Sequence, residues 1–365
     1  MNTKILIISK FYFPDNTPRA FRTFELAKQF SKQGYDVSVL IPNVTEKQVN
    51  HSQSLNIKLI NLGIIDFSDF KTNIKVIDRT IFRSLNLLFD YPDIKLFPKI
   101  FRFLKTSNDY DVILSIAVPH SIHWAVAYFL SINKKNKIRW IADCGDPFMG
   151  SETDTFKKLF YFEYIERFFC KKADYITVPF EGAIDSYYKE FKNKIKVIPQ
   201  GFKFFKKNSI DGSKLKFSHN KKVFLYAGSF IKGLRDPSKF LKYLSKIDLD
   251  FCFLVYTNDD KCLEVFKKIL GSKLKISKYI DRINLFKIMY NVDFLINFDN
   301  NVSGQLPSKL IDYAMTSKPI LNIESDLNIN IIDEFLNGDY SNSLKIHNLD
   351  DYKIENVTNK FIDLF

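Results

Sequence analysis

The residues best suited to chemistry lie near the end of the chain, in a segment of small, polar and cationic residues. An apolar run at 293–298 predicts a buried strand, and a loop then leads to Pro307, which suits the first turn of a helix. On a helical projection, Lys309 and Asp312 share the polar face. Free N–H groups and the helix dipole favour an anion there, so the segment predicts an anion site. Asp312 is placed to accept hydrogen bonds from a ribose-like hydroxyl pair; the alternative is an exposed ion pair between the two side chains.

A second cationic segment follows an apolar strand that ends in Gly228 and Ser229. The loop after that strand carries Lys232 and Arg235, and Pro237 suits the start of the next helix. A strand end with small residues, a cationic loop and a helix start are the parts of a diphosphate site. The segment lacks both the Walker pattern and Gly-x-Gly-x-x-Gly, so on its own it is a weak signal.

The N-terminal half places charged residues after two of its predicted strands. Arg19 and Arg22 follow the first strand, and Asp143 and Asp146 follow the strand at 139–142. The carboxyl ends of strands in an open parallel sheet meet at the ligand crevice, which predicts that these side chains contact a substrate. The alternatives are two solvated arginines and an ordinary Asp-Pro turn.

His120 and His123 approach the same predicted edge from a loop that opens a helix. No carboxylate or thiol follows them at metal-ligand spacing, so we expect no metal and no cofactor. They are weaker candidates than the two aspartates for orienting a substrate, and a purely structural role is the alternative.

Alternating apolar strands and helices predict an α/β fold with doubly wound sheets. At 365 residues, 46% of them hydrophobic, the chain is long for one core. We expect a domain over 1–202, a second over 203–349 that begins with a polar linker, and a tail helix over 350–365.

Composition narrows the cellular setting and the partners. The formal charge of +13 favours a nucleic acid or an anionic membrane surface, and no nucleic-acid-binding motif accompanies it. Four cysteines without paired spacing, no secretory pattern and no long apolar run predict a reduced, cytoplasmic protein. Bulky apolar and cationic residues mix over 67–105, which fits either a helix at an anionic bilayer surface or one packed on a sheet.

Several segments together resemble a known family. In the first half these are 12–14, 18–20, 34–37, 109–115, 140–148, 173–178 and 197–202. In the second half they are 226–229, 235–237, 307–309, 312–313 and 318–321. Their order and spacing resemble GT-B glycosyltransferases of family GT4, in the subgroup found in bacterial capsule and O-antigen gene clusters.

The resemblance implies two Rossmann-like domains that face each other across a cleft, with the acceptor on the first and a nucleotide sugar on the second. It implies a retaining, metal-independent transfer from a UDP- or GDP-linked donor to a glycan or lipid-linked acceptor. The basic charge and the mixed apolar and cationic segment at 67–105 suggest, separately, docking at the inner face of the plasma membrane. Lys309 and Arg235 would stabilise the leaving diphosphate, while Asp143, Asp146, His120 or His123 would orient the acceptor. Arg19 and Arg22 would bind that acceptor. The donor-binding set would be Gly228, Ser229, Lys232, Ser303, Gly304, Gln305, Pro307, Ser308 and Asp312.

The sequence also departs from the family pattern. The family carries two glutamates eight positions apart in this region, whereas this chain has Gly304 and Asp312. Two alternatives therefore stay open: a GT-B nucleotide-sugar epimerase or hydrolase, which needs no acceptor, and a non-catalytic subunit that binds a nucleotide sugar. No nucleic-acid partner is expected.

Overall fold

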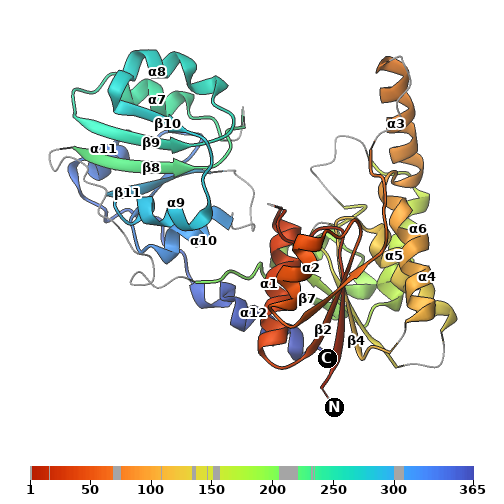
Figure 1. Ribbon diagram of the computed structural model, residues 1–365. Coiled ribbons are helices and arrows are strands. Elements are labelled where there is room, and N and C mark those ends of the chain that lie inside the picture. The colour runs from red at the N-terminus through yellow and green to blue at the C-terminus, as the bar shows by residue number, and fades with distance from the viewer. Residues whose placement is uncertain are drawn as a thin grey trace. The chain divides into compact units, whose positions relative to one another are not determined.

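The computed structural model describes residues 2–15, 17–68, 75–107, 109–133, 137–145, 147–150, 157–204, 221–231, 233, 235–299 and 308–365. The chain divides into two compact units (Figure 1). The first unit comprises Met1–Lys203 and Asp351–Phe365, and the second comprises Phe204–Asp350. Among the described helices, none is long and apolar enough to cross a membrane.

The first unit is built on a seven-stranded parallel sheet in the order β3-β2-β1-β4-β5-β6-β7. Its central strands are almost wholly buried, as their apolar sequences predict. The strands are β1 (Lys4–Ile8), β2 (Asp36–Ile41), β3 (Ile57–Asn61), β4 (Val112–Ile116), β5 (Arg139–Asp143), β6 (Tyr175–Val178) and β7 (Ile195–Val197).

Helices pack on this sheet, and local capping explains where several of them start. In the first, the Thr17 side chain accepts from the Ala20 N–H and Pro18 fills the first helical position. The helices are α1 (Pro18–Lys32), α2 (Glu46–Gln53), α3 (Lys75–Phe89), α4 (Leu96–Thr106), α5 (Ser121–Ile132), α6 (Tyr161–Lys172) and α12 (Ile354–Ile362). The helix α3 projects beyond the rest of this unit (Figure 1).

The C-terminal segment belongs to the first unit. The N–H of Phe202 donates to Tyr352 O at 2.8 Å, and the N–H of Ile354 donates to Phe202 O at 3.0 Å. The helix α12 packs on α1 and buries Val357 and Phe361 completely. These apolar contacts anchor the end of the chain to its beginning.

One predicted helix takes a different form. The sequence indicates a helix from about 181 to 191, but the structure has two 3₁₀ segments, at Glu181–Ser186 and Lys189–Lys194. Tyr187 between them has an extended backbone, with φ −108° and ψ 169°. Its side chain is buried in the core, and a continuous helix would not allow this bend.

The second unit is built on a five-stranded parallel sheet in the order β10-β9-β8-β11-β12. The strands are β8 (Lys222–Ala227), β9 (Phe251–Tyr256), β10 (Leu274–Ser277), β11 (Phe294–Phe298) and β12 (Ile320–Ile323). The helices are α7 (Ser238–Leu244), α8 (Glu264–Leu270), α9 (Arg282–Met289), α10 (Ser308–Met315) and α11 (Ile329–Asn337). The loop after β8 and the start of α10 therefore follow two adjacent central strands at the carboxyl edge of the sheet.

Candidate functional site

The site of greatest interest in the second unit is centred on Lys309, in the first turn of α10. Its ammonium nitrogen lies 4.7 Å from the centroid of the Tyr226 ring, which comes from the end of β8. The nitrogen is buried and has no hydrogen-bond partner among the described residues. An ammonium held in this state has lost its water without gaining a full replacement, which is costly unless a ligand supplies one.

Arg235, from the loop after β8, is the second cation of this site. Its Nε is also buried and has no hydrogen-bond partner in the described part of the chain. Burial, followed by the nearby Arg235 charge, lowers the pKa of Lys309 to about 7, and Asp299 acts in the opposite direction. Arg235 also lines a pocket of about 310 Å³ with Phe230, Pro237 and others. Two close cations with open donor positions are the arrangement that an anion would complete.

The loop after β8 is held in place by tyrosines. The Tyr226 hydroxyl donates to Ser229 O at 2.9 Å, and the Ala227 N–H donates to the Tyr313 hydroxyl at 2.9 Å. A Cβ added at Gly228 would lie 2.9 Å from the Tyr226 hydroxyl, so this position accepts only glycine without a shift. The Ser229 hydroxyl lies 2.9 Å from the hydroxyl of Tyr279.

Asp312, one turn after Lys309, is bound by an arginine that the sequence analysis did not single out. Arg282 Nη2 donates to Asp312 Oδ1 at 2.7 Å, and Arg282 Nε lies 3.2 and 3.3 Å from the two carboxylate oxygens. Burial raises the pKa of Asp312 and Arg282 opposes that rise. Instead of the alternative ion pair with Lys309, Asp312 therefore pairs with Arg282 of α9, 30 positions away, and no local spacing could indicate that contact.

Several predicted donor-binding residues cannot be placed in this picture. Ser308 is the exposed first residue of α10. The others fall outside the described residues: Lys232, Ser303, Gly304, Gln305 and Pro307.

In the first unit, Asp143 at the end of β5 is fully engaged by its neighbours. Arg22 Nε and Nη2 donate to its two oxygens, each at 2.7 Å, and the Thr177 hydroxyl donates at 2.6 Å. Arg22 also donates to Pro199 O at 2.6 Å. Although burial alone would raise it, the pKa of Asp143 is lowered by Arg22, Arg19 and Thr177. Both partners of this pair are buried, so the role they can fill is to position the strand ends and Arg19.

Arg19 is the more accessible of the two predicted acceptor-binding arginines. Its guanidinium lies 4.0 Å from Asp143, and its side chain is 19% exposed. It lies directly against Gly145: a Cβ there would fall 1.1 Å from Arg19 Nη2. The Arg19 guanidinium can occupy this position at the edge of the sheet because Gly145 has no side chain. The companion aspartate, Asp146, lies outside the described residues.

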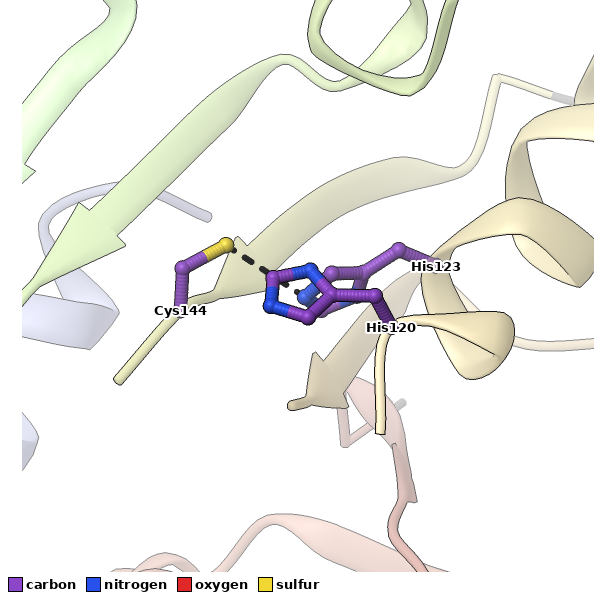
Figure 2. Close-up of side chains that lie close together, drawn as sticks. All are labelled: His120, His123 and Cys144. Atoms are coloured by element: carbon purple, nitrogen blue, oxygen red, sulfur yellow. Dashed lines mark hydrogen bonds between the residues drawn. The ribbon is translucent and has the colours of Figure 1, made fainter. Parts of the chain in front are cut away.

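His120 and His123 meet a third side chain, Cys144, at the same edge (Figure 2). His123 Nε2 lies 3.4 Å from Cys144 Sγ, and His123 Nδ1 lies 2.8 Å from the Ser115 hydroxyl. The Trp140 indole N–H donates to that hydroxyl at 2.8 Å. Burial, then His120 and Arg19, hold the pKa of His123 well below its usual value, and burial raises the pKa of the Cys144 thiol.

Cys144 is a member of this cluster that its position in the sequence did not reveal. Cys144 follows β5, 21 positions after His123, and its N–H donates to Thr177 O at 2.8 Å. Ligand spacing along the chain does not reveal such a pair, because β4 and β5 become neighbours only in the folded sheet. Adjacency of β4 and β5 in a predicted parallel sheet was the signal available.

The chain was compared with known protein families, curated sequences and solved structures. No model of a known protein family matches the sequence, and no curated protein sequence does. Solved structures match along almost the whole chain. HepE of Anabaena, in complex with UDP, has a TM-score of 0.64 at 11% identity, covering 99% of each chain. A glycosyltransferase from Rickettsia africae has a TM-score of 0.61 at 14% identity, covering 100% of this chain and 97% of the other.

The chain has a GT-B fold. The predicted fold class, with two doubly wound parallel sheets, is confirmed. UDP-GlcNAc 2-epimerase from Neisseria meningitidis, bound to UDP-GlcNAc, is also similar, with a TM-score of 0.56 at 15% identity and 99% coverage of both chains. At these sequence identities, the similarity of this chain to each of the three proteins is evidence for a shared fold alone.

Proposed function

We propose that the protein is a retaining glycosyltransferase that moves a sugar from a nucleotide-diphosphate donor to a lipid-linked glycan acceptor in surface polysaccharide synthesis. The observation that carries the proposal is the pair of buried nitrogens on Lys309 and Arg235, neither of which has a hydrogen-bond partner among the described residues. They lie where a strand end meets a helix start, which is the usual position of a diphosphate in an α/β sheet. UDP is the first nucleotide to test, because the similar HepE was solved with UDP and with UDP-glucose.

In the proposed reaction, the bond between the sugar and the diphosphate breaks while the acceptor hydroxyl forms the new glycosidic bond. Negative charge grows on the departing phosphate, and Lys309 and Arg235 stabilise it without a metal at that place. The leaving phosphate oxygen takes the acceptor proton on the same face of the sugar, which retains the configuration. Asp312, held by Arg282, keeps free lone pairs for the ribose hydroxyls.

The proposal assigns supporting roles to the first unit. Arg19 is the accessible cation for an anionic acceptor group, and Arg22 with Asp143 holds the surrounding strand ends in place. His120 and His123 are buried, with 2% and 0% of their surface exposed, so neither is offered as a proton-transfer group for the acceptor.

Turnover of a nucleotide sugar tests the proposal. UDP-glucose and other nucleotide sugars are incubated with the full chain and a bacterial lipid extract as acceptor, and released nucleotide is measured. Lys309→Met should lower turnover about 100-fold, as the loss of a main charge contact to the transition state does. Lys268→Met removes the same charge from an exposed position on α8 and should leave turnover unchanged. Near-normal turnover by Lys309→Met would exclude the assignment.

The epimerase is the second candidate, because the Neisseria epimerase is similar along nearly the whole chain. The two functions separate in an incubation of UDP-GlcNAc without acceptor. Conversion of the sugar to its 2-epimer would favour the epimerase, while a transferase leaves the sugar unchanged until an acceptor is added.

A lipid-linked acceptor would bring the protein to an anionic membrane surface, and α3 is the element that suits this. Val76, Ile77, Leu88 and Phe89 are exposed on it. Arg79 and Arg83 are exposed on the same helix, and Arg102 is exposed on α4. An exposed helix that combines bulky apolar and cationic side chains suits a bilayer interface.

Flotation with anionic liposomes tests the membrane contact. Wild type is compared with a variant that carries Glu at the three exposed arginines, 79, 83 and 102. Lys99 is left unchanged because its Nζ donates to Ile64 O at 2.8 Å. Equal binding of both proteins to the liposomes would exclude this surface.

A further inference from the structure

The cluster of His120, His123 and Cys144 has the composition of a metal centre, and the proposed transfer reaction makes no use of it. The three side chains are 2%, 0% and 1% exposed, and their ligand atoms lie within 4.8 Å of one another. They come from two elements: both histidines from the start of α5, and the cysteine from the residue after β5 (Figure 2). We propose that these three residues bind a zinc-class transition metal ion.

The ligand atoms lie within 4.8 Å of one another, and an ion would draw them closer together. With zinc–nitrogen bonds of about 2.0 Å and a zinc–sulfur bond of about 2.3 Å, tetrahedral ligand atoms lie roughly 3.3–3.6 Å apart. The 3.4 Å between His123 Nε2 and Cys144 Sγ already matches one edge of that tetrahedron. Two imidazoles and a thiolate are the donors that zinc-class ions prefer over magnesium or calcium.

The surroundings of His123 support the same assignment. Its other ring nitrogen, Nδ1, lies 2.8 Å from Ser115 Oγ, which in turn accepts from the Trp140 indole at 2.8 Å. In the tautomer in which Nδ1–H donates to Ser115, Nε2 keeps its lone pair on the side of Cys144. A second hydrogen bond that fixes ring orientation and tautomer is typical of metal-binding histidines.

Tyr187 lies beside the cluster. Its side chain is only 6% exposed, and its hydroxyl lies near the Cys144 thiol. A Cys144 thiolate formed on metal binding would accept a hydrogen bond from this hydroxyl, which is the kind of outer contact that supports metal ligands.

Metal binding would release one proton from the cluster. The metal ion enters as a divalent cation, the Cys144 thiol becomes a thiolate, and its proton leaves to solvent. Charge is partly balanced within the cluster, and the buried carboxylate of Glu166 is nearby. The ion would join the first turn of α5 to the end of β5, beside Asp143. It belongs to the first unit and takes no part in holding the diphosphate.

The test uses the full chain with any affinity tag removed. Elemental analysis after growth with added zinc should give about one equivalent per chain, and Cys144→Ser and His123→Ala should lower it at least tenfold. Cys170→Ser, a buried cysteine outside the cluster, and Cys262→Ser, an exposed one, should keep the full amount. Equal metal content in Cys144→Ser and wild type would overturn the proposal.

A measurement on the wild type alone guards against variants that fail to fold. Metal-free wild type, shown to be folded by circular dichroism, is titrated with Co²⁺. We expect a sulfur-to-cobalt charge-transfer band that saturates at about one equivalent, with about one proton released at pH 7. Absence of the band in folded protein would overturn the proposal. Because neither readout involves nucleotide or turnover, failure here leaves the proposed transferase function untouched, and the reverse is also true.

Discussion

Binding of a nucleotide sugar should transfer a proton onto Lys309. In the free protein its pKa is about 7, because burial and Arg235 disfavour the charged form. A diphosphate beside the ammonium would favour that form and return the pKa toward the ordinary value of about 10.5. At pH 8 about one in eleven free molecules carries this proton, so binding should take up about 0.9 proton, and at pH 6 only about 0.1.

The same shift sets how affinity depends on pH. Only the protonated fraction is ready for the diphosphate, so the apparent Kd at pH 8 should be about tenfold weaker than at low pH, or about 1.4 kcal/mol. Below pH 6 the affinity should level off. UDP-glucose is the ligand to use, because its two phosphates do not titrate in this range.

Isothermal titration calorimetry in buffers with different ionisation enthalpies measures the proton count directly. Lys309→Arg is the matched control, because arginine stays charged at every pH used and should bind without proton uptake. Lys309→Met should bind more weakly at all pH values and also take up no proton. Wild-type binding at pH 8 with no proton uptake would refute the reasoning that Lys309 contacts the diphosphate.

Three further predictions concern stability and the first unit. Because the folded-state pKa of Lys309 lies below the unfolded value of 10.5, the unfolding free energy should rise from about pH 7 to 10.5. By this linkage Lys309→Met should be the more stable protein at pH 7 in denaturant melts, by about 4 kcal/mol less the packing that the lysine side chain contributes. Asp143→Asn leaves Arg22 buried without its charge partner and should cost about 3–5 kcal/mol, whereas Asp109→Asn, which breaks an exposed pair with Lys4, should cost less than about 1 kcal/mol; equal losses would contradict the buried pair. Gly145→Ala should displace the Arg19 guanidinium with little loss of stability, so turnover should fall as it does in Arg19→Ala, and the double variant should be no slower than either; additive losses would show that the two positions act separately.

The strands were the most predictable part of the structure, because a parallel sheet covered on both faces requires continuous apolar runs. The run at 4–9 became β1 and the run at 293–298 became β11. The segment at 181–191 was less predictable, because burial of Tyr187 outweighed its helical pattern. Local periodicity fixes what a segment can form alone, and a long-range contact decided this case.

The site residues divide in the same way. Lys309 and Arg235 follow from position in a doubly wound sheet, so sequence reasoning brought both to one place. The partners of Asp312 and His123 could not be predicted in this way, because Arg282 and Cys144 reach them from elements that are distant in the sequence. Arg22 was expected to bind the acceptor, but its side chain is buried and pairs with Asp143. The sequence does not distinguish an arginine that binds a ligand from one that holds a buried carboxylate.

The position of helix α12 affects how the first unit folds during synthesis. The first unit contains residues from both ends of the chain, with the whole second unit encoded between them. During synthesis the surface of α1 that receives Val357 and Phe361 stays uncovered until α12 has left the ribosome, after the whole second unit. A gene truncated before residue 351 would therefore yield a first unit with an open apolar seam, and separate expression of that unit needs a circularly permuted or fused tail.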